Sequence, residues 1–112
     1  MPARLLKLKE KNDFFLVFRQ GQVRNNEFLS VRFHKNGQKN SRFGVLAPVK
    51  AFRRANQRNR LKRKLRVILR HFAVDFLPGQ DVILVARPGL DSSGREVLTA
   101  ARDLFQKAGL TK

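Results

Sequence analysis

The chain of 112 residues has no cysteine, tryptophan or tyrosine, and it has only one methionine and two histidines. Without cysteine, neither a disulfide scaffold nor a thiolate metal site can form, and two histidines would need carboxylate partners to hold zinc. No apolar run approaches the roughly 18 residues of a membrane-spanning helix. The basic first residues, MPARLLKLKEKND, have no long apolar core or cleavage site, so we expect no secretory signal.

Acidic residues are also scarce. Eight Asp and Glu stand against 25 Lys and Arg, which gives a formal net charge of +17. Between Phe28 and Val74 there is no carboxylate, and the same stretch carries 14 cations, ten of them between Lys50 and Arg70. Charge of this size repels itself unless a polyanion balances it. The composition therefore favours a nucleic acid as partner, with an anionic membrane surface as the second candidate.

Apolar residues make up 42% of the chain, enough for one folded domain over residues 1–112. The pattern predicts a first helix capped by Asn12 or Asp13, and a capping box of Ser93 and Glu96 that opens a last helix. The predicted elements are the first helix ending near Gln20, strands over Phe28–His34, Arg42–Pro48 and Asp81–Arg87, a helix over Asn56–Ala73, and the last helix. Their order, α-β-β-α-β-α, predicts an α+β sandwich.

The helix predicted over residues 56–73 has two different faces. An apolar stripe follows the helical period and predicts a core-facing side, and it consists of Leu61, Leu65, Ile68 and Phe72. Polar and cationic residues with the same spacing lie opposite, and they are Asn59, Arg63, Arg66 and Arg70. Because the apolar stripe is needed for a core, a membrane-surface helix is disfavoured. Arginine also favours phosphate, since the guanidinium fork binds it bidentately.

Phenylalanine is frequent, with ten in the chain, and three of them lie on the first predicted helix. Helix geometry places Phe14 and Phe18 on one side and turns Phe15 away by about 100°. Core packing is the plain interpretation of each ring taken singly. The alternative is a platform on which unpaired bases stack, flanked by cations.

No arrangement of residues indicates catalysis by the protein itself. Neither His34 nor His71 has an obvious nucleophile nearby, and the carboxylates are scattered. The segment from Gly89 to Glu96 lacks the Lys and the following Ser/Thr of a phosphate-binding loop. We therefore predict no catalytic and no metal-binding side chains.

The segment ANQRNRLKRKLR at residues 55–66 resembles the Arg-Asn-Arg signature of the bacterial ribonuclease P protein subunit, roughly A-x-x-R-N-R-x-K-R-x-x-R. Three other segments are similar to the same family. Asp13–Gly21 matches its Asp-Phe-x-x-Val-Phe-x-x-Gly pattern, Arg42–Gly44 matches an Arg-hydrophobic-Gly strand, and Val85–Arg87 matches a late strand ending in Ala-Arg. The resemblance thus covers nearly the whole chain.

The sequence also departs from that family. Of the usual Lys-Lys pair only Lys50 remains, Arg53 stands where Gly is expected, and Asn56 stands for the Val after the Ala. Val31 replaces an aromatic residue that is often found on the first strand. We therefore expect a different backbone path into the basic helix.

The resemblance implies the fold of the second domain of ribosomal protein S5, with a left-handed βαβ crossover. It implies a bacterial, cytoplasmic ribonucleoprotein in which a catalytic RNA subunit holds Mg²⁺ and cleaves the 5′ leader from precursor tRNA, with no further protein required. Residues expected to bind the RNA subunit are Lys50, Arg53, Arg54, Arg58, Asn59, Arg60, Lys62, Arg63, Arg66 and Arg70. Residues expected to line a cleft for the single-stranded leader are Phe14, Phe18 and Val31. The composition alone leaves open a ribosomal or architectural RNA-binding protein.

Overall fold

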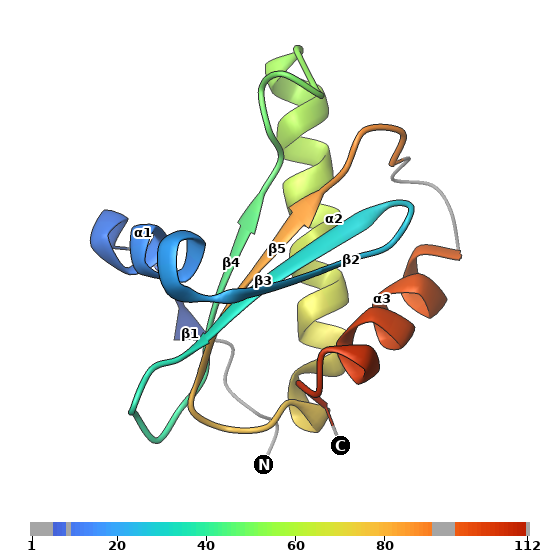
Figure 1. Cartoon of the computed structure of the whole chain (residues 1–112). Helices are drawn as coiled ribbons and strands as arrows, with labels where there is room; N and C mark the ends of the chain where they lie inside the picture. Colours follow the sequence, from blue (N-terminus) through green and yellow to red (C-terminus); the bar gives the residue numbers. More distant parts are fainter. Residues whose placement is uncertain (1–5, 9, 91–95, 112) are drawn as a thin grey trace.

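A computed structural model of the chain describes residues 6–8, 10–90 and 96–111, and Figure 1 shows one sheet with helices on both of its faces. The elements in chain order are β1 Leu6–Lys7, α1 Lys11–Gln20, β2 Gln22–Asn25, β3 Leu29–Lys35, β4 Arg42–Leu46, α2 Ala55–Phe72, the 3₁₀ turn η1 Ala73–Asp75, β5 Gln80–Ala86 and α3 Glu96–Lys107. The strands are arranged in the order β1-β4-β5-β3-β2.

The six predicted elements occur in the predicted order, and the ends of β3, β4, α2 and β5 lie within two residues of their predicted positions. The predicted cap of α1 is wrong. Glu10 occupies the N-cap position without a side-chain hydrogen bond, and Asp13 lies inside the helix. Ser93 lies outside the described residues. Strands β1 and β2 were not predicted, because β1 has two residues and β2 is exposed along its whole length and so shows no alternation.

The connection between β4 and β5 has an unusual hand. These two strands are parallel neighbours, and α2 joins them. With α1 toward the viewer, α2 lies behind the sheet and the chain passes from β4 to β5 on its right (Figure 1). The crossover is therefore left-handed, as the resemblance implied, against the strong preference for right-handed βαβ units.

The main core lies between the sheet and the pair of helices α2 and α3. The whole apolar stripe predicted for α2 is buried there, and Leu69 joins it. Three ring pairs run through this layer, with centroid distances of 5.0 Å for Phe43–Phe76, 4.9 Å for Phe76–Phe105 and 5.7 Å for Phe72–Phe105. Edge-on and tilted aromatic pairs stabilise a core beyond their buried area. These four phenylalanines are therefore structural.

Helix α1 covers the opposite face and crosses the sheet from β4 toward β3. Val17 is buried in a small second cluster with Leu8 and Ile83. Phe14 packs over β4, where a Cβ on Gly44 would lie only 2.6 Å from the ring carbon Cζ. The glycine of the Arg-hydrophobic-Gly strand is therefore needed for the close approach of α1.

Arg42 fixes α1 to the sheet through two carboxylates. Its Nε and Nη2 donate to the two oxygens of Asp81 at 2.8 and 2.6 Å, and its Nη1 donates to Asp13 on α1 at 3.1 Å. Asp81 is only 4% exposed and also accepts a hydrogen bond from Asn36. Hydrogen bonding to Asp81 raises the pKa of the Arg42 guanidinium above its ordinary value. The partly exposed ion pair of Arg42 with Asp13 thus adds to the apolar packing that places α1 on the sheet.

Candidate nucleic-acid interface

The segment between β4 and α2 forms a short loop, residues 47–54, that presents cations beyond the end of the sheet. Phe52 is buried and anchors it. The carbonyl of Pro48 accepts hydrogen bonds from the backbone N–H groups of Ala51 and Phe52 at 3.2 and 3.0 Å. Among the described residues no residue other than glycine has a positive φ, so Arg53 fits without strain where the family has glycine. The ordered loop holds its cations in place.

Arg58 is part of this support. It lies half-buried on the inner side of α2, and its Nη1 donates to the carbonyls of Phe52 and Arg53, at 2.9 Å each. Because that nitrogen is hydrogen-bonded to two backbone carbonyls of the loop, Arg58 stabilises the conformation of the loop. Its expected contact with the RNA stays a prediction beside this structural role.

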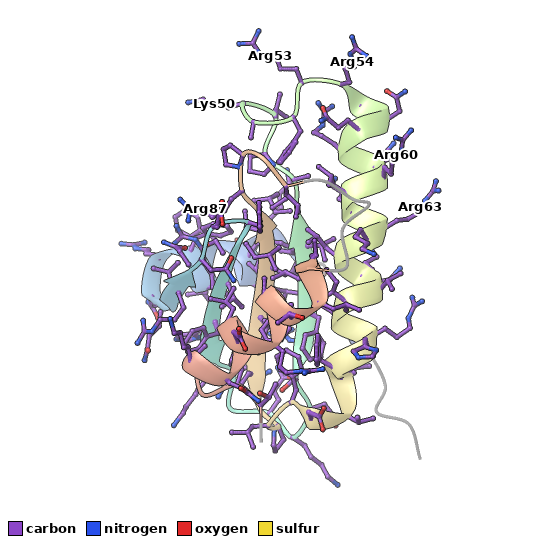
Figure 2. All side chains as sticks on the ribbon, turned by 90° about the vertical axis from the view of Figure 1, so that its right-hand side faces the viewer. Lys50, Arg53, Arg54, Arg60, Arg63 and Arg87 are labelled. Atoms are coloured by element: carbon purple, nitrogen blue, oxygen red, sulfur yellow. The ribbon has the colours of Figure 1, made fainter. Side chains whose placement is uncertain are left out.

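The other cations of this end project into solvent. Lys50, Arg53, Arg54, Arg60 and Arg63 point outward from the loop and from the first half of α2 (Figure 2). We call these five residues the basic face. Arg54 and Arg60 line one hollow of about 330 Å³ together with Asn56 and Gln57. Two guanidinium groups and two amides around a shallow hollow are well suited to a phosphate group.

The remaining predicted contacts on α2 continue beside the basic face. Asn59, Arg66 and Arg70 are exposed, whereas Lys62 is half-buried. Within residues 6–8, 10–90 and 96–111, the ion pairs within 4 Å are those of Arg42 with Asp13 and Asp81. The first turn of α2 holds no acidic residue, and its N-cap residue makes no side-chain hydrogen bond. The positive end of the helix dipole therefore adds to the positive charge of the cations at the start of α2.

A second surface lies beside α1. The guanidinium carbon of Arg32 on β3 lies 4.5 Å from the ring centroid of Phe18, and Phe18 is 37% exposed. Val23 on β2 pairs with Arg32 across the sheet and is exposed. We call Phe18, Arg32 and Val23 the stacking surface. A flat ring against a cation suits unpaired bases. Sequence analysis missed Arg32 and Val23 in this role, although the alternation of β3 already placed Arg32 opposite the core.

The three residues expected in the leader cleft do not meet. Phe14 packs over Gly44 on β4, whereas Phe18 lies over Arg32 on β3. Val31 is fully buried on the other face of the sheet, in the core shared with α2 and α3. This placement corrects the expectation for Val31, since it has no surface to offer a nucleotide.

The described residues do not suit a resident metal ion. They contain no group of three or more His, Cys, Asp or Glu side chains that could hold one. Asp13 and Asp81 are both paired with Arg42.

No helix in the described part of the chain is both long enough and apolar enough to cross a membrane.

Comparisons with known proteins agree on one family. A family model described as Ribonuclease P matches residues 2–109. The ribonuclease P protein component of Synechocystis is 35% identical over 107 residues, which cover 94% of this chain and 86% of that protein. The corresponding component of Thermotoga maritima is 35% identical over 91 residues, covering 81% and 77%.

Solved structures show the same fold. The RNase P protein of Thermotoga maritima superimposes with a TM-score of 0.71 at 32% identity, covering 91% of this chain and 93% of its own. The Staphylococcus aureus RNase P protein gives a TM-score of 0.82 at 19% identity, over 97% and 100% of the two chains, which is a likeness of fold alone. The alternative of a ribosomal or architectural protein finds no support in these comparisons.

Proposed function

The chain belongs to the ribonuclease P protein family, and we propose that it assists a catalytic RNA subunit in removing the 5′ leader from precursor tRNA in the bacterial cytoplasm. As a ribonuclease P protein component it has an RNA subunit as partner. The observation that carries the proposal is the basic face, where five exposed cations lie on a loop and helix that the core holds in place.

The basic face binds the RNA subunit. Phosphate contacts from Arg and Lys dominate RNA affinity and make it depend steeply on salt. The ordered loop lowers the entropy lost on binding, because Phe52 and Arg58 already fix its backbone.

The stacking surface binds the single-stranded leader. Unpaired bases gain affinity by stacking on aromatic rings and guanidinium planes, and Phe18 with Arg32 offers both. Strands β4 and β5 continue past α1 toward the end where α2 begins (Figure 1). A leader on this side of the sheet would therefore run toward the RNA subunit on the basic face.

The RNA subunit supplies the chemistry, with Mg²⁺ held by its phosphates, and no additional protein is needed. This chain binds the RNA subunit and the leader, orients the leader, and screens the charge of the phosphates. Magnesium prefers oxygen ligands and commonly binds through phosphates.

Reconstitution tests the proposal. The chain is mixed with a bacterial ribonuclease P RNA and a 5′-labelled precursor tRNA at low Mg²⁺, and leader release is followed. We expect protein-dependent cleavage at the mature 5′ end. Spermidine at equal total charge serves as the control, because it screens phosphates without positioning them. Tight RNA binding that leaves the cleavage rate unchanged would contradict the proposal and favour an architectural role.

Replacing Phe18 with alanine should weaken precursor binding to the reconstituted enzyme by about 5- to 150-fold, because stacking is worth roughly 1–3 kcal/mol per base. Affinity for mature tRNA, which has no leader, should stay unchanged. Leu16→Ala is the matched control, since Leu16 is exposed on the same helix and has no aromatic ring. Filter binding measures both ligands. Equal losses for the two variants, or for the two ligands, would contradict the leader assignment.

A further inference from the structure

The turn between β2 and β3, residues 26–28, lies at the same end of the sheet as the basic face. Leu29 at the start of β3 pairs with Ala86 at the end of β5, and Leu46 at the end of β4 pairs with Val85. Because the loop of the basic face follows Leu46 directly, this turn and that loop share one end of the sheet. A leader that runs from the stacking surface to the basic face therefore passes the turn.

Asn26 holds this turn through both groups of its side-chain amide. Its Oδ1 accepts hydrogen bonds from the backbone N–H groups of Phe28 and Leu29, at 3.1 and 2.9 Å. Its Nδ2 donates to the carbonyl of Ala100 on α3 at 2.9 Å, and its backbone N–H donates to the carbonyl of Leu29 at 2.9 Å. Asparagine suits such turns because its side chain supplies an acceptor to the backbone two residues on. The half-buried Asn26 therefore determines the backbone path of the turn.

The side chain of Arg87 is held by this same backbone. Its Nη1 donates to the carbonyl of Asn26, and its backbone N–H donates to the carbonyl of Phe28 at 3.0 Å. Arg87 directly follows β5, which lies between β3 and β4, so it lies between the stacking surface and the loop of the basic face. In Figure 2 it lies on the same side of α2 as Lys50.

The guanidinium of Arg87 has donors to offer beyond the one that the turn uses. A guanidinium carries five N–H groups, and it binds phosphate strongly when its fork is held in a fixed direction. Among the described residues no ion pair within 4 Å includes Arg87. The carbonyl of Asn26 therefore orients a cation on the path of the leader without neutralising its charge.

We propose that Asn26 is a positioning residue for leader binding. It fixes the turn so that its backbone carbonyl directs the guanidinium of Arg87 toward a phosphate of the leader. Asn26 acts through Arg87 and makes no contact with the RNA itself. The inference rests on the proposed function, because the leader is the ligand toward which Arg87 is directed.

The variant Asn26→Ala tests the proposal in the reconstituted enzyme. The quantity measured is the ratio of the affinity for precursor tRNA to the affinity for mature tRNA, in which general effects on charge and folding cancel. We expect this ratio to fall about three- to tenfold, as for the loss of one hydrogen-bonded contact. The cleavage rate at saturating enzyme should stay unchanged, because Asn26 acts on binding of the leader alone.

Asn36 provides the matched control at the opposite end of the sheet. Its Oδ1 accepts from the N–H of Gln38 at 2.7 Å, and its Nδ2 donates to Asp81 at 2.9 Å, so its amide holds a turn in the same way. Asn36→Ala should lower the melting temperature at least as much as Asn26→Ala, because Asp81 is buried, yet leave the affinity ratio unchanged. A ratio lowered equally by both variants would show a loss of folding alone and would overturn the proposal.

Two further variants test whether Asn26 acts through Arg87. Adding Asn26→Ala to Arg87→Ala should lower the ratio no further than Arg87→Ala alone. Asn26→Asp keeps the acceptor for the turn and loses only the donor to Ala100, so its ratio should stay within about twofold of wild type. A further loss in the double variant, or an Asp variant as weak as Asn26→Ala, would overturn the proposal. Failure of the proposed function is distinguishable, because the wild-type chain would then not stimulate cleavage.

Discussion

Replacing Arg42 with alanine should lower the free energy of unfolding by about 3–5 kcal/mol, because it leaves Asp81 as an uncompensated buried charge. Asp81 is 4% exposed, and Arg42 supplies two of its hydrogen bonds. A domain of this size has a total stability of about 5–15 kcal/mol, so this loss is a large part of it. Urea unfolding at neutral pH measures the change, and the melting temperature should fall by more than about 10 °C.

Three further variants separate the contributions of the charge of Arg42, of its guanidinium fork and of its two carboxylate partners to this loss of stability. Arg42→Lys keeps the charge but loses the fork, so it should recover only part of the stability. Asp13→Ala removes the partly exposed partner and should cost about 1 kcal/mol or less. The double variant Arg42→Ala with Asp81→Asn should be more stable than Arg42→Ala alone, because no buried carboxylate remains. If the double variant gained nothing, stranded charge could not be the reason.

This network shows the limit of what the sequence predicts. Arg42 was noted only as part of a family motif, because its partner Asp81 is 39 residues away and meets it only through the register of β4 with β5. Spacing along one element carries no information about such a register.

Features that lie within one element were predictable. The period of α2 separated its buried stripe from its exposed cations, and the structure confirms both. The same period also indicated that Arg58 lies on the buried side of α2. Arg58 lies three residues before Leu61 and seven before Leu65, which places it on the inner side, where it binds the loop carbonyls.

At Val31 the family resemblance and the strand pattern predicted different environments. The alternation of Leu29, Val31 and Phe33 already placed these three residues on one face of the strand. The family position suggested a contact with the leader, but the strand pattern described the packing correctly, since all three are buried. Where a chain departs from its family at a site residue, local periodicity is the safer guide to exposure.

Replacing Arg54, Arg60 and Arg63 together with alanine should weaken binding to the RNA subunit by roughly 10²- to 10³-fold. Each lost contact is worth about 1–1.5 kcal/mol here, as for an ordinary hydrogen bond and not as for a buried charged group, because these side chains are exposed. The slope of log affinity against log salt should become shallower by about 2 to 3, because fewer counterions are displaced. Fluorescence titration at several salt concentrations measures both quantities.

The matched control removes the same number of charges elsewhere. Lys35, Lys39 and Lys107 are exposed on parts of the chain outside the basic face, and a triple alanine variant at these positions has the same net charge as the first. If the general field of the protein attracts the RNA, both variants should lose affinity equally, since field strength follows net charge. If the loop and α2 hold their cations against particular phosphates, only the first variant should lose affinity and slope. Equal losses would contradict the basic face as the binding site, and the structure favours the unequal result because Phe52 and Arg58 fix that loop.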